Sequence, residues 1–369
     1  MLRSVGKVIK RAHGIYVNNA VDLSSTKVFG FDYDYTLAEY QTATTKFIYD
    51  CALNYLVEKY GYPSKIRHLP YDPDFIIRGL FFDPKHSVMM KLDSYSVIDA
   101  NAVFIGLERV SDQELSNIYS TRRMGVHRLD KNFRGTGKHG FYQVLDDFSM
   151  PEAYLLQSVV QFFRDEELRF EPLLMYRTIR AAISDVHISQ ALYRNVTENK
   201  ELHLGPAESM RSVVSYLAHK EMFIISNSPF WFINMGMTHL VGHDWRDAFE
   251  VVICEAGKPD FFIERNRPFL EMKETKVSTP QKQRYEKREN WTSAAKLEKG
   301  KIYYEGCLAE FGRLTEWDQK SVLYFGDQIN ADLAEPSLRF GWRTAAVIPE
   351  LSEEIDIYGS QEFRYDLFT

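Results

Sequence analysis

Five short apolar segments, each followed by a polar or glycine-containing turn, constrain the fold of this chain more than any other feature. Runs of this length and apolarity are typical of strands that are buried on both faces. Helical patterns lie among them at 208–219, 305–314 and 332–340, where Pro336 is expected to shorten or kink the last. Strands that alternate with helices predict parallel βαβ units, and hence an α/β fold with a doubly wound parallel sheet. The segments are residues 26–32 (TKVFGFD), 222–228 (MFIISNS), 250–256 (EVVICEA), 321–327 (SVLYFGD) and 342–348 (WRTAAVI).

The spacing of the segments is uneven. Roughly 190 residues separate the first from the second, far more than the dozen or so that a parallel crossover needs. This stretch contains helix candidates at 151–166 and 176–196, so it is expected to form an inserted domain. A highly charged stretch at about 265–302 has few large apolar groups and is expected to be a solvated excursion. The predicted organisation is a catalytic core at 16–44 and 200–351, a cap or substrate domain at 45–199, and a C-terminal tail at 352–369.

The composition excludes several classes of partner. The chain has 45 basic and 51 acidic residues and a net charge of −6, which argues against general affinity for nucleic acid polymers or anionic membranes. No segment approaches the roughly 18–20 uninterrupted apolar residues of a membrane helix. The three cysteines are scattered and lack CxxC spacing, which favours a reducing compartment and predicts a cytoplasmic protein. The basic first 20 residues leave a mitochondrial presequence open as the alternative.

Asp32 and Asp34 stand one residue apart where the first apolar segment ends. Alternate side chains of a strand share a face, so both carboxylates can point toward the same ligand. Two close carboxylates repel each other unless a cation lies between them or they divide acid and base roles. Taken alone, the pair could equally cap the following turn, with Thr36 assisting. The motif by itself therefore leaves a structural and a catalytic interpretation open.

Polar side chains also follow three of the other apolar segments. Ser226 and Asn227 offer a hydroxyl and an amide that can hold phosphate oxygens. Lys258 offers an ammonium suited to neutralising an anion. Asp327 and Asp332 form a second acidic pair, of the type that binds Mg²⁺ through oxygen ligands. In a doubly wound sheet ligands collect at the carboxyl ends of the strands, so these groups form one candidate site.

In chain order these groups are an acidic pair, a hydroxyl, a lysine and a second acidic pair, which resembles the haloacid dehalogenase superfamily of phosphatases. In detail the motifs are similar to the cytosolic purine 5′-nucleotidase family, and most similar to its 5′-nucleotidase domain-containing branch. The resemblance implies a haloacid dehalogenase-like core of Rossmann type with an inserted, mostly helical cap. It runs from about residue 16 to 351 and includes GFDYDYTLAEY, DPDFIIRGL, FSMPEAYLL, NSPF, KPDFF, LTEWDQKSVLYFGD and GWRTAAVIPEL.

The resemblance also implies a mechanism. Asp32 would be the nucleophile that forms an aspartyl-phosphate, and Asp34 the general acid that protonates the leaving ribose oxygen and then activates water. Ser226 and Lys258 would bind the transferring phosphoryl group. Mg²⁺ would be the cofactor, held by Asp32, the backbone carbonyl of Asp34, Asp327 and, in support, Asp332.

Substrate choice would lie with the cap, which closes over the site in this family. In the purine enzymes an aromatic ring stacks on the base, and an arginine and a histidine contact the nucleotide. The matching residues here are Phe148, Arg180 and His187, although all three could instead simply pack the cap. The pattern departs at Ser184, where the purine enzymes have an aspartate. The nearby Asp185 lies about 100° around a helix and need not reach the same ligand.

The sequence thus predicts a Mg²⁺-dependent 5′-nucleotidase-type phosphatase that hydrolyses purine nucleoside 5′-monophosphates. Its partner would be a nucleoside monophosphate or another phosphate ester. Two alternatives stay open. One is a haloacid dehalogenase-type phosphatase or phosphotransferase for another phosphate ester, and the other is a catalytically weak scaffold protein of the same fold. A homo-oligomer is a further expectation, weakened if this chain, which ends at Thr369, is a truncated form.

Overall fold

The structure is a computed structural model that describes residues 14–17, 22–125, 140–275, 284–286 and 293–359. These residues form two compact units, each described here by itself. The first unit takes its residues from Met1–Leu37, Val213–Phe230 and Arg246–Thr369, and the second from Ala38–Ser212 and Trp231–Trp245. Most of the basic N-terminus, part of the charged insertion and residues 360–369 lie outside the described residues.

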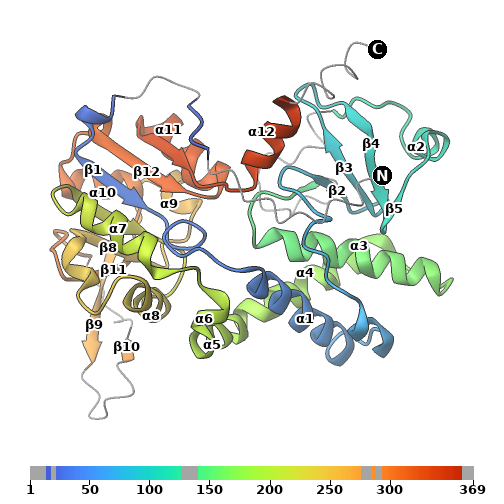
Figure 1. Ribbon diagram of the computed structural model, residues 1–369, viewed down its shortest axis with the longest axis horizontal. Coiled ribbons are helices and arrows are strands. Elements are labelled where there is room, and N and C mark those ends of the chain that lie inside the picture. Colours follow the sequence, from blue (N-terminus) through green and yellow to red (C-terminus); the bar gives the residue numbers. More distant parts are fainter. Residues whose placement is uncertain (1–13, 18–21, 126–139, 276–283, 287–292, 360–369) are drawn as a thin grey trace. The chain divides into compact units, whose positions relative to one another are not determined.

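The first unit is built on a sheet in which six parallel strands follow the order β11-β8-β7-β1-β12-β13. The chain starts in the middle at β1, moves outward on one side through β7, β8 and β11, and returns to the other side for β12 and β13 (Figure 1). This reversal is the mark of a doubly wound sheet, so the predicted fold class is confirmed. The strands are β1 (Val28–Phe31), β7 (Glu221–Ile225), β8 (Val251–Cys254), β11 (Ile302–Glu305), β12 (Val322–Gly326) and β13 (Arg343–Ala346).

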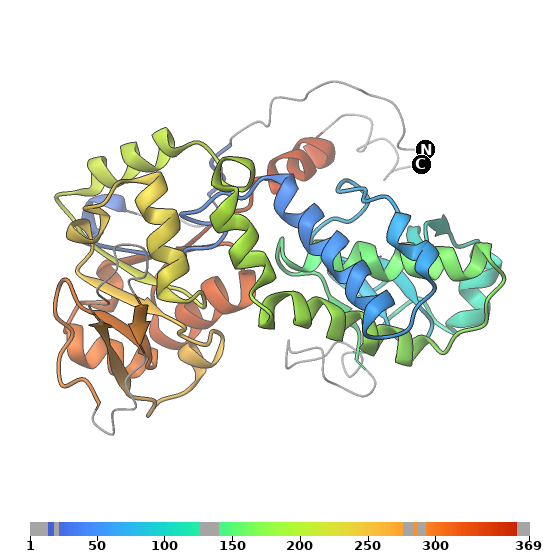
Figure 2. The same cartoon turned by 90° about the horizontal axis from the view of Figure 1, so that it is seen from below.

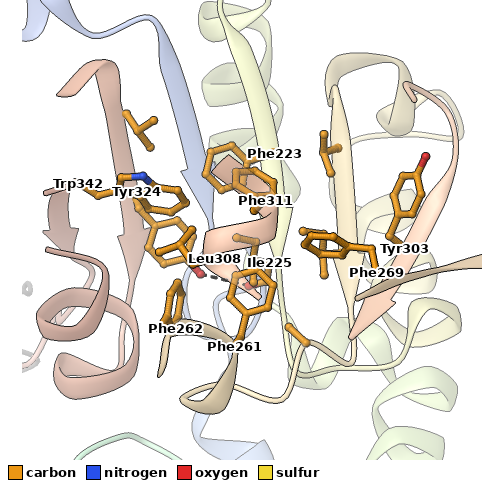
Figure 3. Close-up of a cluster of buried hydrophobic side chains, with 14 of the residues drawn as sticks. Phe223, Ile225, Phe261, Phe262, Phe269, Tyr303, Leu308, Phe311, Tyr324 and Trp342 are labelled. Atoms are coloured by element: carbon orange, nitrogen blue, oxygen red, sulfur yellow. Dashed lines mark hydrogen bonds between the residues drawn. The ribbon is translucent and has the colours of Figure 1, made fainter. Parts of the chain in front are cut away.

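A buried aromatic cluster covers one face of this sheet (Figure 3). Alternate residues of each strand point to this face, as the two-residue period of a strand requires. Phe223 of β7 lies at its centre, with its ring centroid 5.0 Å from that of Phe311 and 6.1 Å from that of Tyr324. Gly30 of β1 makes room for this ring, because a Cβ there would lie 2.1 Å from Cζ of Phe223. The helices that contribute to the cluster are α9 (Asp260–Ile263) and α10 (Leu308–Thr315).

Part of the charged insertion continues the sheet, which corrects the expectation of a solvated excursion. β9 (Phe269–Thr275) pairs antiparallel with β11, and β10 (Arg284–Glu286) pairs antiparallel with β9. Phe269 is fully buried in the aromatic cluster, which fixes the start of β9 in the core. Phe269 and Met272, both buried, therefore hold this strand in place, although its sequence is rich in charge.

The helix expected at 332–340 is α-helical only over Glu335–Phe340, so it is shortened, and Pro336 lies in its first turn. A π-helical segment covers Ile329–Ala334, and α11 (Glu335–Phe340) follows it with Pro336 in its first turn. Proline is tolerated there because the first backbone N–H groups of a helix have no partner within it. The remaining α-helices with residues in this unit are α7 (Ala207–Leu217), which crosses the unit boundary, α8 (Phe230–Leu240), of which only Phe230 lies in it, and α12 (Leu351–Gly359).

The second unit is mostly helical, as expected, but it also contains an antiparallel sheet that the sequence analysis did not predict. The sheet has the order β5-β4-β3-β2-β6. Its strands are β2 (Phe81–Asp83), β3 (Val88–Leu92), β4 (Ile98–Ile105), β5 (Glu108–Arg109) and β6 (Tyr142–Gln143). Several of them are too short for a periodic pattern to be recognised.

Three long helices of the second unit pack against one another (Figures 1 and 2). They are α1 (Thr42–Glu58), α3 (Ser149–Asp165) and α4 (Pro172–Ile188). The predicted helix at 176–196 is in fact two, because the chain turns at Gln190, whose φ is 57°, before α5 begins. The other helices are α2 (Asp112–Ile118), α5 (Ala191–Glu198), α6 (Lys200–His203) and most of α8 (Phe230–Leu240).

The division into core and cap stays a prediction. The second unit begins at Ala38 and includes Trp231–Trp245, whereas the sequence analysis placed the cap at 45–199. Among the described residues, no helix combines the length and the apolarity needed to cross a bilayer.

Candidate active site

The predicted polar groups of the first unit follow four neighbouring parallel strands, β8, β7, β1 and β12, at their carboxyl ends. Asp32 directly follows β1, Ser226 follows β7, Asp327 follows β12, and Lys258 lies on the segment after β8. Backbone hydrogen bonds extend the ladders past the strand ends. The N–H of Asp32 donates to the carbonyl of Phe325 at 2.9 Å, and that of Ser226 donates to the carbonyl of Ile253 at 2.9 Å. The backbone under the site is therefore held as firmly as the strands themselves.

Lys258 lies between two carboxylates. Its Nζ is 2.8 Å from Oδ2 of Asp32 and 2.7 Å from Oδ1 of Asp332. The three side chains are only 4%, 9% and 1% exposed, respectively. The hydroxyl of Tyr324 also lies 3.3 Å from Oδ1 of Asp332. Buried charges are tolerated only when they are paired in this way, so the three ionisable groups depend on one another.

The pKa values of Asp32 and Lys258 reflect this dependence. Burial raises the pKa of Asp32 from 3.8 to about 7; Asp332 and Asp34 also raise it, while Lys258 lowers it. Burial lowers the pKa of Lys258, but the carboxylates of Asp32 and Asp332 outweigh burial and hold that pKa above its ordinary range. Lys258 therefore stays a cation. A further positive charge near Asp32 would favour the ionised form of the Asp32 carboxyl group.

The turn after β7 ties the other groups together. Oγ of Ser228 donates to Oδ2 of Asp34 at 2.6 Å, and the N–H of Ser228 donates to Oγ of Ser226 at 3.0 Å. The amide of Asn227 binds the backbone of Lys258 at both ends: Oδ1 accepts from its N–H at 2.6 Å, and Nδ2 donates to its carbonyl at 3.1 Å. These contacts give Asn227 a positional task, and its expected contact with phosphate stays a prediction.

Three carboxylates converge at the site. Oxygen atoms of Asp32, Asp327 and Asp332 all lie within 4.8 Å of one another, and all three residues are buried. Three buried carboxylates face one ammonium, so the donor set suits a divalent cation that prefers oxygen ligands, such as Mg²⁺. The carboxylate of Asp34 is not in this group, and its expected contribution through the backbone carbonyl stays a prediction.

Sequence reasoning missed Ser228 and Tyr324, and it noted the glycine before Asp327 without assigning it a role. Ser228 stands two residues after Ser226, and its position in a polar turn after a buried strand was the signal available. The sequence pattern identified Tyr324 only as a residue of an apolar strand. Gly326 allows a close approach, because a Cβ there would lie 2.3 Å from Cβ of Asp332. The glycine before Asp327 is thus required by the second acidic pair.

The predicted base-binding residues belong to the second unit, where two of them touch. The ring centroids of Phe148, just before α3, and His187, on α4, are 6.0 Å apart in an edge-on arrangement. Burial lowers the pKa of His187, although Asp146 opposes this shift. The side chain of His187 is therefore favoured in its neutral form.

Arg180 lies two helical turns before His187 on α4 and is enclosed by aromatic and acidic groups. Its Nε is 3.2 Å from Oε1 of Glu152, and its guanidinium carbon lies 5.3 Å and 5.6 Å from the ring centroids of Tyr142 and Tyr176. Burial raises the pKa of Glu152 from 4.5 to about 7, against the opposing charge of Arg180. Packing and ligand contact both remain compatible with this environment.

Asp185 has partners of its own. Both of its carboxylate oxygens lie 2.7 Å from Nζ of Lys59, and the hydroxyl of Tyr60 donates to Oδ2 at 2.8 Å. Ser184, one helical turn after Arg180 on α4, is exposed. Asp185 is thus engaged by Lys59 and Tyr60, and the departure from the purine pattern at Ser184 stays a prediction.

The profile of the 5′ nucleotidase family matches residues 15–369. The 5′-nucleotidase domain-containing protein 2 of Rattus norvegicus is 41% identical over 356 residues, covering 96% of this chain and 62% of the rat protein. The human protein of that name is also 41% identical, with 96% and 66% covered. A 5′-nucleotidase domain-containing protein of Dictyostelium discoideum is 33% identical over 362 residues, with 96% and 58% covered. This chain thus spans roughly three fifths of the length of these relatives.

A solved structure described as a HAD-hydrolase, YfnB from Bacillus subtilis bound to magnesium, shows a weaker similarity. It has 12% sequence identity and a TM-score of 0.31, covering 87% of this chain and 86% of that protein. At this level the similarity adds nothing to the topology described above.

Proposed function

The chain belongs to the 5′ nucleotidase family, and from this premise we propose that it is a Mg²⁺-dependent phosphatase that hydrolyses nucleoside 5′-monophosphates. The observation that carries the proposal is the buried ammonium of Lys258, held between the carboxylates of Asp32 and Asp332 at the carboxyl ends of the strands. Phosphoryl transfer depends mainly on positioning and on charge neutralisation, and such a group supplies both.

In the proposed reaction an oxygen of Asp32 attacks phosphorus, and the bond between phosphorus and the ribose oxygen breaks. Asp34 gives its proton to that departing oxygen. Water then attacks the aspartyl-phosphate and loses a proton to Asp34, which releases inorganic phosphate and restores the carboxylate of Asp32. Each residue therefore returns to its starting state after one turnover.

Lys258 and Ser226 serve the phosphoryl group in this proposal. The ammonium of Lys258 orients Asp32 and neutralises charge on the transferring oxygens. The hydroxyl of Ser226 accepts from the N–H of Ser228, which leaves its own O–H available as a donor. Mg²⁺, when bound, would supply further neutralisation of the phosphoryl charge, held by Asp32, Asp327 and Asp332.

The test is phosphate release from IMP or GMP by the purified chain. We expect release with Mg²⁺ and its loss with EDTA or with Asp32→Asn, which removes the nucleophile. Asp50→Asn is a matched control, because Asp50 is exposed in a surface ion pair with Lys46 and such pairs contribute little. Folded protein that releases no phosphate from any ester of a broad panel would contradict the proposal.

A second candidate function is a phosphatase or phosphotransferase for another phosphate ester. The observation that favours it is the engagement of Asp185 with Lys59 and Tyr60, which leaves only a serine hydroxyl at position 184. Measuring phosphate release with and without added inosine separates a phosphatase from a phosphotransferase. Formation of a phosphorylated nucleoside supports the transferase, and its absence removes that version.

A scaffold protein of the same fold is the third candidate. Beryllofluoride mimics the phosphoryl group on an aspartate, so an active site of the proposed type should bind it together with Mg²⁺. We expect it to raise the melting temperature of the wild-type protein and not that of Asp32→Asn. An unchanged melting temperature in both would favour the scaffold.

A further inference from the structure

The three residues after β7 form a turn that holds two of the proposed reacting groups. Asn227 binds the backbone of Lys258, and Ser228 binds the side chain of Asp34. The oxygen atoms of Ser228 and Asp34 are 2.6 Å apart, which is the length expected of a hydroxyl that donates to a carboxylate. Ser228 is 3% exposed, so water does not compete freely for this bond.

The hydroxyl of Ser228 is itself held in place by the backbone. The N–H of Ser228 donates to Oγ of Ser226, and its carbonyl accepts from the N–H of Glu255 at 3.1 Å. Glu255 lies directly after β8, whose neighbour in the sheet is β7. A serine side chain has a single heavy-atom torsion, so once its backbone is fixed its oxygen can occupy only a few rotamer positions. Ser228 is therefore a rigid donor, set by two strands of the sheet.

A hydroxyl suits a group that changes its protonation state. It can donate to a carboxylate and accept from a carboxylic acid, whereas an ammonium can only donate. The bond to Ser228 fixes the position of Oδ2 of Asp34, and with it the orientation in which the carboxyl group gives a proton to the leaving group and takes one from water. Loss of this bond removes one restraint on the terminal torsion of the carboxyl group, a torsion that is intrinsically broad.

We propose that Ser228 is a positioning residue that orients Asp34 for proton transfer to the leaving group. The inference rests on the proposed function, because it assigns Asp34 the role of general acid and base. It adds a residue that the motif comparison did not single out. It also gives the two residues of the turn different roles. Asn227 positions Lys258, which serves the phosphoryl group, and Ser228 positions Asp34, which serves the leaving group.

Two substrates of nearly equal size test this division: phenyl phosphate, whose phenolate is basic, and p-nitrophenyl phosphate, whose phenolate leaves without a proton. General acid catalysis contributes about 10²–10⁴-fold, and misorienting the acid forfeits part of it. For Ser228→Ala we expect kcat on phenyl phosphate and on IMP to fall about tenfold or more, and kcat on p-nitrophenyl phosphate to fall less than about threefold. Ser228→Thr, which keeps the hydroxyl, should restore much of the loss.

Asn227→Ala is the matched control from the same turn. It loosens Lys258, which acts on the phosphoryl group that all the substrates share, so kcat should fall by a similar factor on each. Melting temperatures of both variants show whether they fold. An equal loss on both aryl phosphates for Ser228→Ala, or no loss on either, would overturn the inference and leave the proposed function standing. A wild-type protein without turnover on any of the three substrates would overturn both.

Discussion

His203 of the second unit lies among three helices, and its two ring nitrogens have different partners. Nδ1 is 3.0 Å from Oγ1 of Thr44 on α1, and Nε2 is 2.5 Å from Oδ1 of Asn195 on α5. The amide oxygen of Asn195 can only accept, so Nε2 carries the proton and Nδ1 accepts from the threonine. His203 is 1% exposed, and burial lowers its pKa below the ordinary 6.5. The folded protein therefore favours the neutral ring.

The sign of the resulting pH dependence follows from linkage. Above pH 6.5 the ring is neutral in both states, and its contribution to stability is complete. Below that pH the unfolded chain takes up the proton first, so the free energy of unfolding should fall as the pH falls. We expect His203→Gln to lower stability by about 1–3 kcal/mol at neutral pH, because it disturbs two buried hydrogen bonds. It should also flatten the decline below pH 6.5.

Urea unfolding at a series of pH values measures this effect. His219→Gln is the matched control, because His219 is exposed just after α7 and its ring meets that of Tyr216 edge-on, with the centroids 6.4 Å apart. The control should keep the slope of the wild-type protein. Equal slopes for the wild type and His203→Gln would show that another group causes the acid sensitivity.

At the scale of elements, the end of β12 places the second acidic pair. Gly326 closes this strand, and a Cβ at this position would lie 2.3 Å from Cβ and 2.6 Å from Cγ of Asp332. These atoms stand close to the backbone of the π-helical segment, so they cannot swing away as the end of a long side chain can. Gly326→Ala should therefore move Asp332 away from Lys258, lower kcat, and destabilise the protein by about 1–3 kcal/mol.

Gly312 in α10 provides the comparison. A Cβ there would meet Nε2 of Gln319 at 2.9 Å, which is the end of a flexible side chain. Alanine also favours a helix over glycine by about 1 kcal/mol, so Gly312→Ala should be neutral or stabilising and leave kcat unchanged. Thermal unfolding and phosphate release measure both variants. A Gly326→Ala protein with the stability and kcat of the wild type would refute the argument about close approach.

The elements also show what the sequence could and could not predict. The five apolar segments became five parallel strands. Four of them are largely buried and carry a strong apolar signal, whereas β13 at the edge of the sheet is only partly buried. The strand β9 was missed because its burial depends on Phe269 amid charged neighbours. The antiparallel strands of the second unit were missed because several are very short. Local pattern predicts elements that are buried throughout, and it fails where tertiary contacts decide.

The same distinction holds within the candidate site. Asp32, Lys258 and Asp332 were singled out from their places after apolar runs, and the structure brings them into contact. Ser228 could not be ranked above its neighbours, because the bond to Asp34 joins residues that are 194 positions apart. A pairing of that kind depends on the order of strands in the sheet, which the sequence pattern does not specify.

At the scale of the whole molecule, the net charge of −6 is small, but its distribution is uneven. The carboxylates of Asp32, Asp327 and Asp332 are buried together against the single ammonium of Lys258. Close like charges destabilise one another, so the metal-free protein carries a repulsive term that a bound cation would remove. A ligand that binds only the folded state raises the free energy of unfolding by about 2.7 kcal/mol when its free concentration is 100 times its Kd.

Mg²⁺ should therefore raise the melting temperature of the wild-type protein, and EDTA should reverse the rise. Asp327→Asn removes one of the three carboxylates and keeps the size of the side chain. We expect this variant to be at least as stable as the wild type without metal, because one repulsive charge is gone, and to lose most of its response to Mg²⁺. A variant that is merely misfolded would instead be less stable under both conditions. Asp50→Asn, changed at an exposed site, should keep the full response. A response to Mg²⁺ that survives Asp327→Asn unchanged would place the cation elsewhere and separate the acidic cluster from metal binding.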